Sequence, residues 1–201
     1  MRPKGFSSEK REILEIAINN LEEEIHAGME TAAAPYIEAL RAGDLAFTET
    51  INFAGFARFL AMQSLRGPAF AEPLRKTFAD AIIGPLRHIF SNNIGWSLFR
   101  HRERIHIAML EAPPSTGFIT SDRPVINMLH SPGVTTDQMQ LYYPVSPKRA
   151  LLVTADPPRA GRDTILLPES MVAEYNQRIE KSSYNQLYAS SESYLDGRFK
   201  T

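Results

Sequence analysis

Asp122 is the residue in this sequence whose position most suggests chemistry. It follows the short segment Phe118–Ser121 and precedes Arg123 and Pro124. A carboxylate at the end of a strand could act as a catalytic general base or hold a metal ion. The structural alternative, which we favour, is an Asx turn in which the Asp oxygen accepts backbone N–H groups and ends the strand.

Other polar side chains are expected beside Asp122. Two predicted strands end close to Ser121 and Arg123 on one side and to Lys148 and Arg149 on the other. We expect the two ends to meet at one rim of the protein. These four residues therefore join Asp122 as candidate binding residues.

Arg66 and Tyr142 are two further candidates for binding. Arg66 precedes the helix-breaking pair Gly67-Pro68 and could pair with a buried carboxylate such as Asp122, which is a structural hypothesis. Tyr142 and Tyr143 point to opposite faces of a strand. One of the two rings is expected in the core, and the other is free to stack on a ligand.

The sequence holds no complete catalytic pattern. A nuclease pattern of Asp followed by Glu-x-Lys fails, because Ser146-Pro147 precedes Lys148. Gly-rich phosphate loops and a Gly-x-Ser-x-Gly elbow are absent. A metal site around Asp122 would need more ligands, and no recognised spacing connects the nearby candidates, which are His101, Glu103, His106 and Glu111. Any cofactor and the identity of any metal stay undetermined.

Composition excludes several classes of protein. The 201 residues contain no cysteine, which rules out disulfides, thiol catalysis and Cys-based zinc sites and favours a cytoplasmic location. No apolar run approaches the roughly 20 residues that span a bilayer, and the first residues lack the apolar core of a signal peptide. The net charge of -1 argues against generic nucleic-acid binding. The basic run Arg100–Arg104 could join Arg123, Lys148 and Arg149 in a positive patch, although solvated surface charge explains it more simply.

Apolar residues three or four positions apart predict helices over the first half of the chain. The first helix begins at Ser8, meets a kink or interruption at Pro35 and ends at Gly43. The second covers about 49–65, and the third covers about 69–90 with an interruption at Gly84-Pro85. Ser91–Asn93 is expected to end it, before another short helical piece at 96–99.

The pattern then changes to alternation, which predicts strands. Strands are expected at 105–110, 118–120, 141–145, 150–154 and 164–167, with a strand or short helix at 125–129. A final helix is predicted over about 168–189. The order predicts an α+β protein in which N-terminal helices pack on a small, mainly antiparallel sheet. We expect one domain over 1–189, with helices over about 8–99 and the sheet over about 104–167, followed by a polar tail at 190–201.

Three segments together resemble a bacterial family designated domain of unknown function 4238. They are FITSDRPV at 118–125, YYPVSPKRALLV at 142–153 and NQRIEKSSYNQLYAS at 176–190, and Leu65–Pro68 resembles the helix break of the same family. The resemblance covers roughly residues 12 to 190. It implies that Asn176, which opens the last of these segments, is a further candidate binding residue. This chain departs from the family at Arg123, where Asn is usual, and lacks the His-Tyr-Val-Pro segment with which longer members open.

The sequence favours a ligand- or partner-binding module with its site around Asp122, because no complete catalytic set is visible. The alternative is a hydrolase that acts on a phosphorylated or nucleic-acid substrate, with or without a metal. A further alternative is a truncated or regulatory relative of longer family members. Substrate and partner stay undetermined, and a homo-oligomer that pairs through the first helix is left open.

Overall fold

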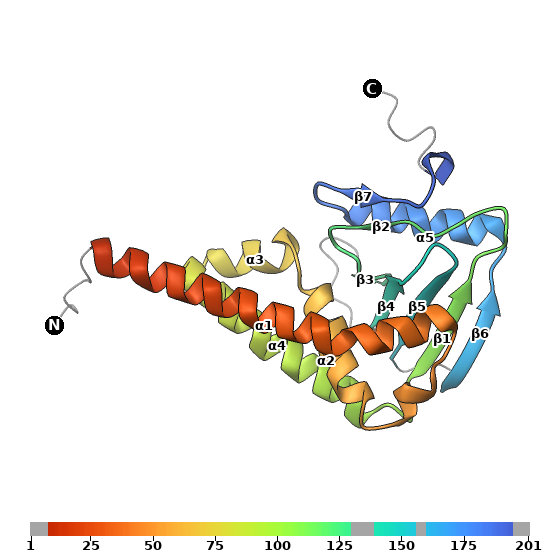
Figure 1. Cartoon of the computed structure of the whole chain (residues 1–201), viewed down its shortest axis with the longest axis horizontal. Coiled ribbons are helices and arrows are strands. Elements are labelled where there is room, and N and C mark those ends of the chain that lie inside the picture. Colours follow the sequence, from red (N-terminus) through yellow and green to blue (C-terminus); the bar gives the residue numbers. More distant parts are fainter. Residues whose placement is uncertain (1–7, 130–138, 156–159, 195–201) are drawn as a thin grey trace.

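The structure is a computed structural model that describes residues 8–129, 139–155 and 160–194. Four helices precede a five-stranded sheet, and a fifth helix follows it (Figure 1). This segregation of helices and strands, with a mainly antiparallel sheet, confirms the predicted α+β class. No helix within the described ranges is long and apolar enough to cross a membrane.

The helical half is more continuous than the sequence predicts. Its elements are α1 (Ser8–Ala42), the 3-10 turn η1 (Ala46–Glu49), α2 (Phe53–Ser64), α3 (Pro68–Arg75) and α4 (Asp80–Arg100). The sequence predicted a kink or an interruption at Pro35, and α1 is not interrupted there. Pro35 and Thr31 are both exposed, so water can bond the Thr31 carbonyl that the proline leaves without a partner.

α4 differs most clearly from the predicted helices. It runs unbroken through Gly84-Pro85 and through Asn92-Asn93, and the break falls instead between α3 and α4. Gly95 explains the continuity, since a Cβ there would lie 2.6 Å from the Cα of Arg58. α4 therefore rests directly on the backbone of α2, and this packing outweighs the low helix propensity of glycine and asparagine.

The main sheet has the strand order β3-β4-β5-β1-β6. All neighbours are antiparallel except β1 and β6, which run parallel. The strands are β1 (His106–Glu111), β3 (Ile126–Asn127), β4 (Gln140–Pro144), β5 (Arg149–Thr154) and β6 (Gly161–Leu166). The segment at 125–129, for which the sequence allowed a helix or a strand, thus contains a strand.

The sheet is covered on both faces, which gives the protein two cores. Alternate residues of β1, β4 and β5 face either side, so that Met109, Tyr143 and Leu151 pack with α1, α2 and α4. Tyr142 and Leu152 pack on the other face with α5 (Glu169–Ser182). Near-continuous burial along the central strands follows from this double cover.

The C-terminal helix is shorter than predicted. α5 ends at Ser182 and not near Ala189, and the chain turns back into β7 (Leu187–Tyr188). β7 pairs with β2 (Thr120–Ser121) in a separate two-stranded sheet. The segment predicted as a strand at 118–120 is thus confirmed only at its end, where it pairs with residues 187–188. The predicted polar tail contains the 3-10 turn η2 (Glu192–Tyr194), and residues 195–201 lie outside the described ranges.

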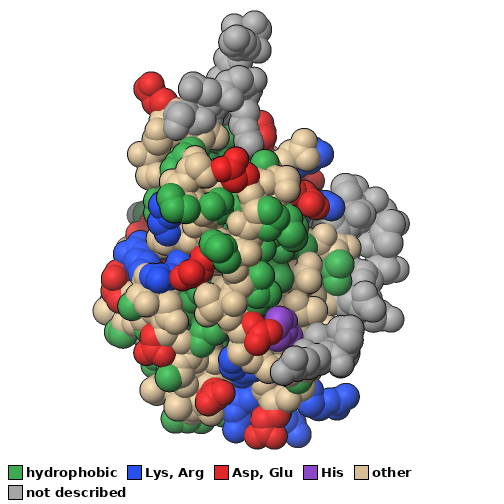
Figure 2. All heavy atoms as spheres, turned by 90° about the vertical axis from the view of Figure 1, so that its right-hand side faces the viewer, with side chains coloured by type: hydrophobic (Ala, Val, Ile, Leu, Met, Phe, Trp, Pro, Cys, Tyr) green, Lys and Arg blue, Asp and Glu red, His purple; other side chains and the backbone are tan. Residues whose placement is uncertain are grey.

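The two ends of the molecule differ in character. The first half of α1, with α3 and the beginning of α4, forms an arm that extends away from the sheet (Figure 1). At the opposite end lies the edge strand β6, where Leu166 is 69% exposed and Ile165 is 37% exposed. Figure 2 shows hydrophobic side chains gathered across the middle of this end, with charged side chains around them.

Candidate functional site

Asp122 joins the end of β2 to the segment that follows α5. Its two carboxylate oxygens accept hydrogen bonds from the backbone N–H groups of Tyr184, at 2.9 Å, and Asn185, at 2.7 Å. Its own N–H donates to the carbonyl of Gln186. Asp122 thus fixes the chain reversal after α5, through the kind of bond to backbone N–H groups that an Asx turn makes.

Ser121 and Arg123 complete this corner. The Ser121 hydroxyl accepts from the N–H of Arg123 and donates to the carbonyl of the same residue. The Arg123 guanidinium donates to the Ser182 carbonyl at 3.2 Å, and its aliphatic part lies so near Gly67 that a Cβ there would meet it at 3.0 Å. Gly67 has a φ of 100°, which favours glycine in any case. Arg123 therefore connects β2 with both α5 and the break before α3.

Arg66 does not take its predicted partner. Its guanidinium donates to Glu30 of α1 at 2.7 Å, and both side chains are partly exposed. The expected buried pair with Asp122 is wrong, because the Asp122 carboxylate is occupied by backbone N–H groups. An exposed ion pair of this kind stabilises by about 1 kcal/mol or less.

Lys148 and Arg149 hold loops of their own chain. The Lys148 ammonium donates to three carbonyl oxygens, those of Pro113, Pro114 and Thr116, at 2.9–3.3 Å. Arg149 donates to Glu111 at 2.9 Å and to the carbonyl of Arg41 at the end of α1. Both cations are engaged within the protein, and neither adds a free charge to a positive patch.

Asn176 is a buried clamp. From α5 its side-chain oxygen accepts the N–H of Ile119 at 3.0 Å, and its side-chain nitrogen donates to the carbonyl of Gly117 at 2.8 Å. It is 4% exposed. An amide matches an extended backbone in this way because it offers a donor and an acceptor together.

The two tyrosines of β4 are both core residues, so the predicted ligand-stacking ring is not available. Tyr142 is fully buried and stacks on Tyr175 of α5, with ring centroids 4.6 Å apart. Tyr143 is 9% exposed and meets Phe59 of α2. Burial raises the pKa of Tyr143 to about 12 and raises the pKa of Tyr142 well above its usual value.

The residues proposed as metal ligands do not assemble. His106 bonds Asp163 at 2.8 Å across β1 and β6, and Glu111 bonds Arg149. Glu103 lies 3.9 Å from Arg102. Within the described ranges no three His, Asp or Glu side chains come close enough together to hold an ion.

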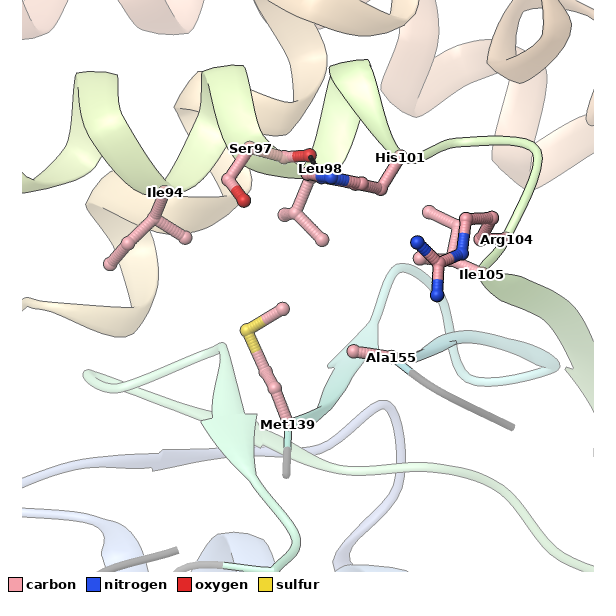
Figure 3. Close-up of a pocket in the computed structure, with 8 residues that line it drawn as sticks. All are labelled: Ile94, Ser97, Leu98, His101, Arg104, Ile105, Met139 and Ala155. Carbon is pink, nitrogen blue, oxygen red and sulfur yellow. Dashed lines mark hydrogen bonds between the residues drawn. The ribbon is translucent and has the colours of Figure 1, made fainter. Parts of the chain in front are cut away.

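A pocket lies elsewhere, between the C-terminal end of α4 and the ends of β4 and β5 (Figure 3). Its volume is about 430 Å³. The lining is apolar except for three side chains, and it consists of Ile94, Ser97, Leu98, His101, Arg104, Ile105, Met139 and Ala155. Figure 3 shows the Arg104 guanidinium at one end of the hollow, above Ala155, and Met139 reaching toward Leu98.

The polar side chains of this pocket differ in the hydrogen bonds that they make within the protein. His101 Nδ1 lies 2.9 Å from the Ser97 carbonyl. A carbonyl only accepts, so Nδ1 carries the proton and Nε2 of the neutral ring is an acceptor. Among the described residues, the Arg104 guanidinium makes no hydrogen bond or ion pair. Arg102, two positions earlier, is engaged by the Phe99 carbonyl and ring.

Comparison with known families decides the relationship of this chain. A family model described as a protein of unknown function (DUF4238) matches residues 14–193. The chain belongs to the DUF4238 family. The matched range agrees closely with the resemblance inferred over residues 12 to 190. No curated protein and no solved structure matches the chain.

In this DUF4238 chain the segments that carry the resemblance come together in space. The segment at 118–125 contains β2 and the Asp122 corner, and Asn176 holds its first residues. Arg123 touches the Gly67 break on one side and the end of α5 on the other. These segments therefore share a structural task, which is to fasten α5 and the end of the chain onto the sheet.

The pocket of this DUF4238 chain was not predicted from the sequence. Arg104 stood within a basic run, and nothing in its spacing distinguishes it from Arg100 or Arg102. Met139 and Ala155 reach the pocket from the ends of strands far away in sequence. The one available signal was that a basic run directly precedes a buried strand.

Proposed function

We propose that this protein is a ligand-binding module whose site is the pocket beside Arg104, and that its ligand is a small apolar carboxylate. The observation that carries the proposal is an arginine that has no side-chain partner among the described residues and lies beside a largely apolar hollow of about 430 Å³. Pockets that bind small molecules commonly measure about 300–1,000 Å³ and combine an apolar lining with a few polar groups.

The chemistry of the polar groups selects a carboxylate. A guanidinium presents paired N–H donors that match the two oxygens of a carboxylate. Nε2 of His101 would accept a hydroxyl or amide hydrogen of the ligand, and the Ser97 hydroxyl can donate or accept. An anion with one further polar group would use all three side chains.

The apolar part of the ligand would lie against Leu98, Ile105 and Met139. Leu98 and Ile105 are buried in the protein, and Met139 is an adaptable side chain that suits varied shapes. Each methylene moved out of water contributes about 0.8 kcal/mol. Affinity is therefore expected to rise with chain length until the pocket is full.

The Asp122 corner supports a structural role better than a site for a ligand or a substrate. Both Asp122 oxygens accept backbone N–H groups, and Lys148 and Asn176 are likewise bonded to backbone. A hydrolase that used Asp122 as its base would have to give up these bonds. We therefore propose the pocket, and not the Asp122 corner, as the ligand site.

Isothermal titration with octanoate tests the proposal, with octan-1-ol and octylamine as ligands of similar length. Octanoate is expected to bind at least tenfold more tightly than either. Arg104→Gln should weaken octanoate binding by about tenfold to a hundredfold, since hydrogen bonds to charged groups contribute about 1.5–3 kcal/mol. Octan-1-ol binding should change little.

Two variants complete the design. Arg100→Gln removes an exposed cation at the last position of α4, four residues before Arg104, that does not line the pocket, and it should leave octanoate affinity unchanged. Ala155→Trp should fill the hollow and abolish binding of all three ligands. Equal octanoate affinity in Arg104→Gln and the parent, or no octanoate binding at millimolar concentration, would overturn the proposal.

A further inference from the structure

A row of exposed side chains runs along the outer face of α4. Its members are spaced three or four residues apart and consist of Ile82, Pro85, Ile89, Asn93, Trp96 and Arg100. Ile82 is 44% exposed, Ile89 54% and Trp96 56%. Positions with this spacing share one side of a helix, so these residues form a continuous strip, the α4 strip.

The other sides of α4 are occupied by the rest of the helical half. α2 lies against Gly95. α3 approaches on the Phe90 side, where the Phe70 and Phe90 rings are 5.8 Å apart. α1 approaches at His88, whose ring is 5.3 Å from that of His26. In the described part of the chain the α4 strip faces away from all three.

We infer that the α4 strip is the contact between two copies of this chain, which pair with their α4 helices antiparallel. The strip is self-complementary about Ile89, because Ile82 and Trp96 stand seven residues on either side of it. Pro85 and Asn93 stand four residues on either side. A two-fold axis through Ile89 would set Ile89 against itself, Ile82 against Trp96 and Pro85 against Asn93. An isologous contact requires this self-matching of one surface.

Charge supports a second copy as the occupant. The strip contains a single charged residue, Arg100 at its C-terminal end, so two strips would meet without like charges at the centre. Phe78 lies just before α4, 42% exposed and as far from Ile89 in sequence as Arg100. Antiparallel pairing brings Arg100 of each copy toward Phe78 of the other, which suits a cation–π contact.

The size of the strip sets the strength of the pair. From Ile82 to Trp96 it covers about 21 Å of helix at 1.5 Å per residue. With a helix width of about 10 Å including side chains, the strip has an area of about 210 Å², which is less than the roughly 800 Å² per partner of a standard interface. We therefore expect dimerisation in the micromolar range, so that monomer and dimer coexist at concentrations that sedimentation can follow.

Sedimentation velocity of the full chain between about 1 and 200 μM tests this inference. The parent should shift from monomer toward dimer across that range. Ile89→Glu places two carboxylates at the two-fold axis and should keep the protein monomeric throughout. Ile51→Glu removes an apolar residue that is 70% exposed but outside the strip, and it should behave as the parent.

Cross-linking fixes the register, because the chain has no cysteine of its own. With diamide as oxidant, Ile89→Cys should form a disulfide-linked dimer at least tenfold faster than Ile51→Cys. Ile82→Cys and Trp96→Cys should each cross-link slowly alone and fast when mixed. A parent that is monomeric at 200 μM, or equal rates for the Ile89 and Ile51 variants, would overturn the inference. Octanoate titration of Ile89→Glu keeps this test separate from the pocket proposal, since the strip does not line the pocket.

Discussion

Asn176→Ala is the substitution that should reveal most directly what fastens α5 to the sheet. The side chain is 4% exposed and bonds the N–H of Ile119 and the carbonyl of Gly117. Both backbone groups belong to buried residues. Removing the amide leaves a buried donor and a buried acceptor without partners, at a cost of about 1–3 kcal/mol each. We therefore expect a loss of about 4 kcal/mol in the free energy of unfolding.

Thermal and urea unfolding measure this loss. For a chain of this length about 1 kcal/mol corresponds to roughly 2–4 °C, so the Tm should fall by about 8–16 °C. Asn176→Asp separates the two bonds, since a carboxylate keeps an acceptor for Ile119 but loses the donor for Gly117. Gln177→Ala, an exposed neighbour on α5, should change the Tm by no more than about 2 °C.

Hydrogen exchange gives a second, local measurement. In Asn176→Ala the N–H of Ile119 should lose more protection than the fall in global stability explains. Amides that pair β1 with β5 should lose only as much protection as the fall in global stability explains. If Asn176→Ala unfolded within about 1 kcal/mol of the parent and the Ile119 amide stayed protected, the bonds to the loop would not be what holds it. The reasoning about this clamp would then be refuted.

Two further predictions concern the hydrogen bonds of Asp122 and the buried tyrosines of β4. Asp122→Ala should destabilise by about 2–3 kcal/mol and speed exchange of the Tyr184 and Asn185 amides, whereas Asp122→Asn, which keeps one acceptor, should do about half as much. The free energy of unfolding should also fall as the pH rises from about 10 toward 12. Burial raises the pKa of Tyr142 and Tyr143 in the folded protein, so the unfolded chain loses its phenol protons first. Urea titrations at pH 9 and pH 11 check this, and Tyr142→Phe should make the decline shallower; an equal decline in that variant would count against the assignment.

The sequence predicted the type of most elements because burial patterns are local. Alternation at 105–110 and 150–154 marked the central strands, and the stripe of the first helix marked α1. The errors arose where a distant segment decides the outcome. α4 continues through Asn92-Asn93 because α2 lies against it at Gly95, and α5 stops at Ser182 where Asp122 takes the next N–H groups.

The candidate site was only partly predictable for a related reason. Position at a strand end made Asp122 and Lys148 candidates for binding partners, and the family resemblance did the same for Asn176. Neither observation could tell whether those partners belong to a ligand or to the chain itself. The parallel pairing of β1 with β6 could not be predicted either, because the residue pattern at 161–166 does not show in which direction the strand runs beside its neighbour.

The number of partners within the chain separates the polar residues with a structural role from the candidate binding residue proposed above. Lys148 has three carbonyl partners and Asp122 has two N–H partners, so a ligand at either would have to replace bonds that already exist. Arg104 has none among the described residues and stands at the edge of an apolar hollow. A ligand there would gain its hydrogen bonds at the cost of water alone, and we therefore propose the pocket, and not the Asp122 corner, as the binding site.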